Sequence, residues 1–131
     1  MAASARTKAF AAADELAERV WRASDAMRIE DRRDLGSQLR RAALSVPCNL
    51  IEGSSRKSAR ERLRFIEIAD GSLREAGYLI EFATRLKVLP PDVGPALLAL
   101  HVRAAGVVTR RRRAASRTAA SHGLKRRPWA E

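Results

Sequence analysis

Basic side chains crowd two nearby stretches of the sequence in a density that is typical of phosphate-binding surfaces. Two neighbouring arginines lie in the segment 37–49, and five more basic residues follow within 56–64. Glu52 and Glu61 are the only acids among them. The pattern predicts contacts with the phosphates of a nucleic acid, and the alternative is a hydrated helix corner in which a carboxylate holds one arginine. The basic residues are Arg40, Arg41, Arg56, Lys57, Arg60, Arg62 and Arg64.

A second concentration of positive charge lies at the C-terminal end. The net charge of the chain is +11, and the segment 110–131 contains a single acid, Glu131. With Trp129 available to stack on a base, this segment is predicted to follow a nucleic-acid backbone. The alternative is a solubilising tail whose arginines reflect composition alone. Its basic residues are Arg110, Arg111, Arg112, Arg113, Arg117, Lys125, Arg126 and Arg127.

Glu75 falls at the edge of the apolar arc of a predicted helix. A buried carboxylate needs a partner or a shifted pKa, and we expect Arg40 or Arg41 to supply the partner. This pattern favours a structural ion pair over an acid–base catalyst. Four further polar residues are expected to make buried structural contacts rather than to line a ligand pocket: Gln38, Ser45, Asn49 and Ser72.

Other residues that carry chemistry are isolated in the sequence. His101 and His122 are too far from other ligand types to predict a metal site, and His101 falls on an apolar helix face. The single cysteine, Cys48, allows neither an internal disulfide nor a cysteine-based metal site. Without a neighbouring base it does not make a convincing nucleophile. We therefore expect no enzymatic activity, no cofactor and no metal.

The segment 58–87 has the most extensive helical periodicity in the chain. Its apolar residues form two rows that together cover about 200° of the helix, against about 100° for a helix lying on a surface. Ser58 followed by Glu61 predicts a capping box at its start. The row expected to face the core is Ile66, Ala69, Leu73, Ala76, Ile80 and Ala83. The row expected to include an interface with another subunit is Phe65, Ile68, Leu79, Phe82 and Leu86, with Ser72 among them.

One further helix is expected near the start of the chain, and another after the segment 58–87. The first covers about 7–27, with Thr7 as its N-cap. The other opens at Pro91 or Asp92 and ends near Arg113. Both carry apolar residues at helical spacing along one face.

A helix is also predicted over about 34–52, after a charged connection. Asp34 is expected to cap it and Gly53 to follow it as the C′ residue. Pro47 lies inside it, but the apolar phase continues across the proline. We therefore expect a kink rather than a break.

These elements predict an all-α fold, an up-down-up-down antiparallel four-helix bundle. The bundle is expected to occupy residues 1–115, and residues 116–131 are expected to form a disordered basic tail. No apolar run is long enough for a membrane span, and the first residues do not form the apolar core of a signal peptide. A cytoplasmic location fits best.

Residues 37–49 read SQLRRAALSVPCN and continue to Glu52-Gly53, and further matching pairs follow at Arg64-Phe65, Ile68-Ala69 and Gly71-Ser72-Leu73. This string resembles the four-helix-bundle family that includes 23S rRNA intervening-sequence proteins and the accessory variability proteins of diversity-generating retroelements. The resemblance covers about 7–110. It implies a four-helix bundle of a kind that often assembles as a homopentamer, with no enzymatic activity. The retroelement relatives bind a reverse transcriptase and nucleic acid through a basic surface. The chain departs from the family pattern at Gly77, where an acid is common, and at Leu79, where glutamine is common.

Two hypotheses follow. In the first, a non-enzymatic oligomeric bundle binds RNA or DNA, or a nucleic-acid enzyme such as a reverse transcriptase, through its basic surfaces. Such binding would be mainly electrostatic, because the chain has no evident motif for reading bases. In the second, the protein is an interaction scaffold with no nucleic-acid role, the second apolar row mediates assembly, and the charge is incidental.

Overall fold

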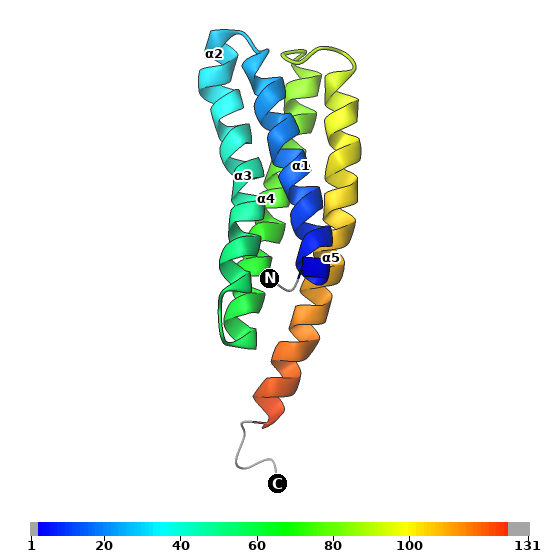
Figure 1. The fold of residues 1–131 in the computed structure, drawn as a ribbon. Coiled ribbons are helices and arrows are strands. Elements are labelled where there is room, and N and C mark those ends of the chain that lie inside the picture. The colour runs from blue at the N-terminus through cyan, green and yellow to red at the C-terminus, as the bar shows by residue number, and fades with distance from the viewer. Residues whose placement is uncertain (1–2, 126–131) are drawn as a thin grey trace.

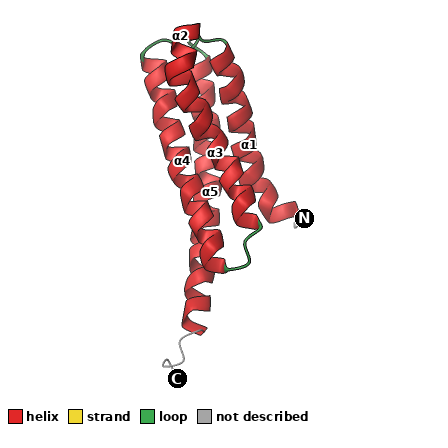
Figure 2. Cartoon of the chain, turned by 90° about the vertical axis from the view of Figure 1, so that its left-hand side faces the viewer, coloured by secondary structure: helices red, strands yellow, loops and turns green. Residues whose placement is uncertain are grey.

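The computed structural model describes residues 3–125, with side chains described from residue 8 to residue 123. Every regular element in this range is helical (Figures 1 and 2). Four of the helices are long, and the second long helix is preceded directly by two short helical segments. The elements are α1 (Ala3–Asp25), α2 (Ile29–Asp31), the π-helical segment η1 (Arg32–Gly36), α3 (Ser37–Ser54), α4 (Ala59–Arg85) and α5 (Val93–Lys125).

The four long helices lie side by side as a helical bundle. Both α1 and α4 pack against α3 and α5. The α1–α2 and α4–α5 connections lie at one end of the molecule, and the α3–α4 connection lies at the other, where α1 begins (Figure 1). In both views α5 extends past the α3–α4 connection (Figures 1 and 2). The start of α1, the end of α3, the start of α4 and the C-terminal part of α5 therefore lie close together at the end of the molecule that contains the α3–α4 connection.

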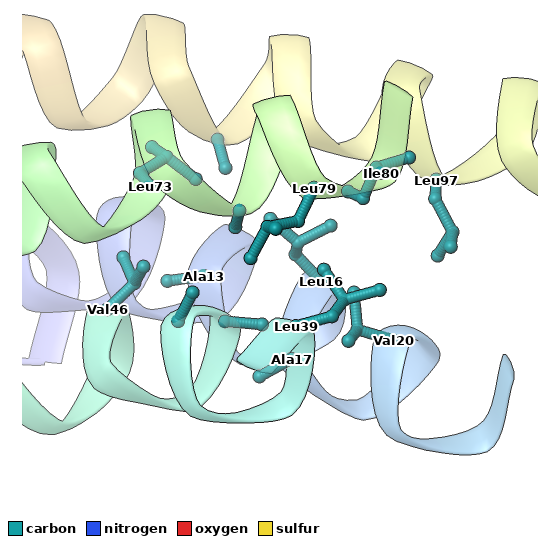
Figure 3. Close-up of a cluster of buried hydrophobic side chains, with 14 of the residues drawn as sticks. Ala13, Leu16, Ala17, Val20, Leu39, Val46, Leu73, Leu79, Ile80 and Leu97 are labelled. Carbon is teal, nitrogen blue, oxygen red and sulfur yellow. The ribbon is translucent and has the colours of Figure 1, made fainter. Parts of the chain in front are cut away.

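The core is built from aliphatic side chains that all four long helices contribute (Figure 3). Burying each leucine, isoleucine or valine stabilises the fold by roughly 1.5–3 kcal/mol, before the entropy of ordering is subtracted. The predicted core row of α4 is confirmed, since every one of its residues is buried. The largest fully buried apolar side chains are Leu16, Val20, Leu39, Val46, Leu73, Ile80 and Val108.

The first two helices differ from the prediction at their starts. The helix α1 begins at Ala3, so Thr7 lies inside it and is not its N-cap. Alanine has the highest helix propensity, and the alanine-rich N-terminal segment extends the helix beyond its predicted start. The charged run predicted as a connection is itself helical, because α2, η1 and α3 follow one another from Ile29. Asp34 therefore lies within a π-helical turn and makes no capping bond.

The helix α3 contains both Pro47 and Gly53. The helix continues through Pro47, so the predicted absence of a break is confirmed. Gly53 lies inside the helix, and the prediction that it is the C′ residue was wrong. A Cβ atom at this position would lie 2.9 Å from Cβ of Phe65, so the glycine allows α3 and α4 to approach each other closely.

The helix α5 continues to Lys125, well beyond its predicted end near Arg113. The predicted disorder is therefore wrong for residues 116–125. Alanine, arginine, leucine and lysine are all strong helix formers, and together they supply seven of the twelve residues in this extension, 114–125. The last residues of the predicted tail, including Arg126, Arg127 and Trp129, lie outside the described range.

Candidate nucleic-acid interface

The turn between α3 and α4 is held together by two of the arginines predicted to bind phosphate. One guanidinium nitrogen of Arg62 donates to the carbonyl oxygens of Arg56 and Lys57, at 3.0 and 2.8 Å. Arg56 pairs with Glu52 and lies 4.9 Å above the ring of Phe65. Both arginines therefore have structural partners, and they fix the conformation of the turn that carries the neighbouring basic residues.

The start of α4 fixes the direction in which the remaining basic residues leave the turn. The hydroxyl of Ser58 accepts a hydrogen bond from the backbone N–H of Glu61 at 3.0 Å, which is the predicted N-cap contact. Lys57, Arg60 and Arg64 are exposed. These three side chains keep their charge at the surface, where they can contact a phosphate.

The helix α5 brings a second set of arginines to the same end of the bundle. A cavity of about 190 Å³ lies between the N-terminal part of α1, the end of α3, the start of α4 and the arginine-rich part of α5. Arg62 and Arg111 both line it, although they are far apart in the sequence. Its other lining residues are Ala9, Phe10, Leu50, Gly53, Ser54, Ala59, Ile66, Ala114, Ala115 and Thr118.

The arginine run of α5 divides between the bundle and solvent. Nε of Arg112 approaches Asp70 on α4 at 3.8 Å, and Arg74 approaches the same carboxylate oxygen at 3.4 Å. Arg110, Arg111 and Arg113 are exposed, as is Arg117 one turn further on. Because α5 contains no aspartate or glutamate, its exposed positive charge is not neutralised from within the helix.

Arg40 and Arg41 do not belong to this end of the molecule. They lie about 24 Å from the turn, at 1.5 Å per residue along α3. Arg40 donates to the buried hydroxyl of Ser24 and to Asp25, the latter at 2.7 Å, and its guanidinium lies 4.6 Å above the ring of Trp21. The seven basic residues therefore do not form one patch, and Arg40 joins α3 to α1.

The expectation for Glu75 was wrong. Its side chain is exposed, and Arg40, one of its two expected partners, pairs with Asp25 instead. Glu75 lines an open groove between α3 and α4 together with Gln38 and Arg41. Gln38 is exposed as well, so neither polar residue is buried as predicted.

The two hydroxyl groups that line this groove connect the two helices. The hydroxyls of Ser45 on α3 and Ser72 on α4 are hydrogen-bonded at 2.9 Å. The amide of Asn49 donates to the hydroxyl of Ser45 at 2.9 Å and to its carbonyl oxygen at 2.8 Å. Asn49 therefore makes both of these hydrogen bonds within α3.

The row predicted to form a subunit interface divides into buried and exposed positions. Leu79 is 7% exposed and belongs to the core of the single chain. Phe65 and Phe82 are half-buried, whereas Ile68 and Leu86 are 42% and 52% exposed. Only the outer part of this row is free to contact another molecule.

His101 has a structural environment. Its Nε2 lies 3.0 Å from the carbonyl oxygen of Leu73, and its ring occupies the space beside Gly77. Within the part of the chain that the structure describes, no three histidine, cysteine or acidic residues gather as a metal site would require. Nor does any helix between residues 3 and 125 combine the length and apolar composition of a membrane span.

Comparison with protein families identifies this bundle. The family model described as 23S rRNA-intervening sequence protein matches residues 6–108. The chain belongs to this family. The match ends at Val108, which is also the last buried residue described in α5. The family region therefore contains the packed bundle and the α3–α4 turn, and the arginine-rich part of α5 follows it. A comparison with curated proteins finds no relative of this chain.

The sequence predicted the basic residues of both segments, but it did not predict that the two segments lie at the same end of the bundle. The signal that it underused was composition. The segment 114–123 lacks apolar periodicity, yet alanine and arginine favour a helix there without burial. A continuous helix directs these arginines along a defined axis, whereas the tail was expected to be disordered.

Proposed function

We propose that this family member is a non-enzymatic protein that binds RNA or DNA through the basic end of its bundle. The surface consists of Lys57, Arg60 and Arg64 on the α3–α4 turn, and of the exposed arginines of α5 (Arg110, Arg111, Arg113 and Arg117). Binding is mainly electrostatic and independent of sequence. The proposed bundle has up-down-up-down antiparallel topology and acts in the cytoplasm.

The observation that supports this proposal is the convergence of two distant basic segments around one cavity. Arg62 and Arg111 line that cavity from α4 and α5. Arg62 is used to hold the turn, and its neighbours remain exposed. Charges from two helices that meet at one end create a stronger local potential than either segment alone.

We further propose that the protein works as a homo-oligomer, with the pentamer implied by the family resemblance. A ring would repeat the basic surface around its axis, and several weak phosphate contacts would add through multivalency. The proposed protein partner of such an assembly is a reverse transcriptase that carries nucleic acid.

The alternative function is an interaction scaffold without a nucleic-acid role. Exposed aliphatic side chains on the outer surfaces of α3 and α4 favour it. Leu44 and Ile51 on α3 are 46% and 42% exposed, in the same range as Ile68 and Leu86 on α4. Apolar groups of this size on a surface can mark a protein interface.

Binding of RNA and DNA by the full chain across a salt series tests the nucleic-acid proposal. We expect log affinity to fall linearly with log salt, with a slope of roughly −0.9 for each duplex phosphate neutralised. The variant Lys57→Gln/Arg60→Gln should lower the affinity on every nucleic acid and make the slope shallower by up to about 1.8.

A charge-matched control is available at the opposite end of the bundle. Arg19 and Arg33 are exposed there, so Arg19→Gln/Arg33→Gln removes the same net charge without touching the proposed surface. Equal losses in the two double variants would assign binding to net charge alone and contradict the location of the site. No binding at low salt by the folded full chain would support the scaffold function.

A further inference from the structure

The helix α5 has two parts with different surroundings. Up to Val108 it contributes buried residues to the core, and between residues 109 and 123 none of its side chains is buried. From Arg110 to Lys125 the helix rises about 22 Å at 1.5 Å per residue. Its first turns still lie beside the bundle, where Arg111, Ala114, Ala115 and Thr118 line the cavity, and in both views its last turns project beyond the α3–α4 connection (Figures 1 and 2). The bundle thus holds one end of a helix whose other end is open to a partner.

Three of the four exposed arginines in this part of α5 form a single stripe, and the fourth, Arg111, lines the cavity on another side of the helix. Arg110, Arg113 and Arg117 follow at intervals of three and four residues and lie within about 60° of the helix circumference. The stripe faces roughly away from Ala104 and Val108, which point into the core. A stripe on the outer side can contact a partner while the opposite side remains attached to the bundle.

Residues 114–123 of α5 also form a helix of small diameter. Between residues 114 and 123 its large side chains are those of Arg117 and His122. A helix with short side chains is at the lower end of the 10–12 Å diameter of an α-helix. The short side chains are Ala114, Ala115, Ser116, Thr118, Ala119, Ala120, Ser121 and Gly123.

We propose that the outer face of α5 over residues 109–125 lies in the major groove of duplex DNA, with Arg113 and Arg117 on its phosphates. This inference rests on the proposed nucleic-acid function and names its substrate class. The major groove of B-form DNA is about 12 Å wide and admits an α-helix. The major groove of duplex RNA is deep and too narrow for side chains to read. Ala120 and Ser121, which neighbour the arginine stripe on the helix, are short enough to allow a close approach to the base edges, and the absence of acids along α5 removes repulsion from the phosphates.

The test compares duplex DNA, duplex RNA and single strands of one sequence, bound to the full chain over a salt series. We expect duplex DNA to bind roughly tenfold more tightly than duplex RNA, because fewer phosphates are within reach of the helix on an A-form duplex. Arg113→Gln/Arg117→Gln should make the salt slope on duplex DNA shallower by about 1.8, for two phosphate contacts. Guanine N7, which lies in the major groove, should be protected from methylation by dimethyl sulfate.

A second pair of variants tests the helix without changing any charge. Ser116 is exposed, so Ser116→Pro interrupts α5 within residues 109–125 and Ser116→Ala preserves it. We expect the proline variant to lose the preference for duplex DNA and the alanine variant to keep it. Circular dichroism then checks that the rest of the bundle is still helical.

The outcomes separate this inference from the function on which it rests. Equal affinity for duplex DNA and duplex RNA would overturn the groove proposal, and so would unchanged DNA binding in Ser116→Pro. In both cases salt-dependent binding would still support the nucleic-acid function. No binding to any nucleic acid at low salt would overturn both.

Discussion

Arg40 and Arg41 are adjacent in the sequence and carry the same charge, but they have different roles in the fold. Arg40 is in contact with a buried hydroxyl, a carboxylate and an indole ring, all on α1. Arg41 is exposed and lines the groove between α3 and α4. A side chain with several partners is expensive to remove, because Ser24 would be left buried beside a gap.

This difference predicts that the two arginines respond differently to the same substitution. Arg40→Gln should lower the free energy of unfolding by about 1–3 kcal/mol, through the lost charge-assisted hydrogen bonds and ring contact. Arg41→Gln should change it by no more than about 0.5 kcal/mol, as for most surface substitutions. Urea unfolding followed by circular dichroism measures both. Equal effects would contradict the anchoring role of Arg40.

Gly77 and His101 form a second pair whose relation is visible only in three dimensions. A Cβ atom at position 77 would lie 2.4 Å from Nε2 of His101. The imidazole cannot move away freely, because Nε2 is also 3.0 Å from the carbonyl oxygen of Leu73. The glycine, which departs from the acid expected from the family resemblance, therefore makes room for a histidine on the facing helix.

Gly77→Ala should destabilise the protein by about 1–2 kcal/mol, since the clash exceeds the gain in helix propensity. His101→Ala removes the ring, so the double variant should be more stable than the sum of the two single effects. A coupling free energy of about 0.5–3 kcal/mol is typical of residues in contact. Thermal unfolding of the four proteins gives this coupling, and strict additivity would refute the contact.

Glu75 shows why the polar residues were harder to predict than the apolar ones. Its helical angle placed it at the edge of the apolar arc, where a rotation of a few tens of degrees decides between burial and exposure. The arc itself was reliable, because its central residues Leu73, Ala76 and Ile80 are buried whatever the precise rotation. The partner of Arg40 could not be inferred either, since Ser24 and Asp25 lie on another helix.

At the scale of the elements, periodicity located the helices more accurately than it located their ends. Residues 34–52 kept one apolar phase, and α3 contains most of them. The helical start at Ile29 and the end of α5 at Lys125 depend instead on propensity and charge, which periodicity does not report. Asp31 and Glu30, for example, favour the start of a helix by their charge.

The end of α4 gives a test of how a helix is terminated. The N–H of Val88 donates to the carbonyl of Ala83 at 3.2 Å, and that of Lys87 to Thr84 at 3.1 Å, which is a Schellman motif. Its C′ residue is Lys87, with a φ of 59°. A side chain in this left-handed region costs roughly 1–2 kcal/mol, and glycine avoids that cost.

Lys87→Gly should therefore stabilise the protein by about 0.5–1 kcal/mol, after subtracting the larger entropy that glycine has in the unfolded chain. Lys87→Ala removes the same charge but keeps a Cβ atom, and should be neutral to within about 0.5 kcal/mol. Differential scanning calorimetry can compare the two. A glycine variant that melts no higher than the alanine variant would mean that the backbone at this position carries no strain.

At the scale of the whole molecule, the outer surfaces of α3 and α4 combine apolar side chains with a polar groove. Tyr78 and Phe82 stack with their ring centres 6.0 Å apart, and Ile68 and Leu86 are exposed on the same helix. Leu79 belongs to the core of the single chain, whereas Ile68 and Leu86 do not contribute to that core. What they add is a surface for association, which is the basis of the proposed oligomer.

Ile68→Asp/Leu86→Asp should lower the mass of the proposed assembly toward that of one chain while the helices remain folded. A carboxylate placed in an apolar contact loses its hydration without gaining a partner, whereas on the exposed surface of a single chain it is tolerated. Val102→Asp is a control for the effect of one carboxylate elsewhere on the surface, because Val102 is 69% exposed on α5 and lies outside the proposed interface. Multi-angle light scattering gives the mass, and circular dichroism confirms the fold. If the full chain is already a monomer, or if the double variant keeps the oligomeric mass, α4 does not form the subunit interface. A ring presents the basic surface several times, so loss of assembly should also weaken nucleic-acid binding, even though no basic residue has changed.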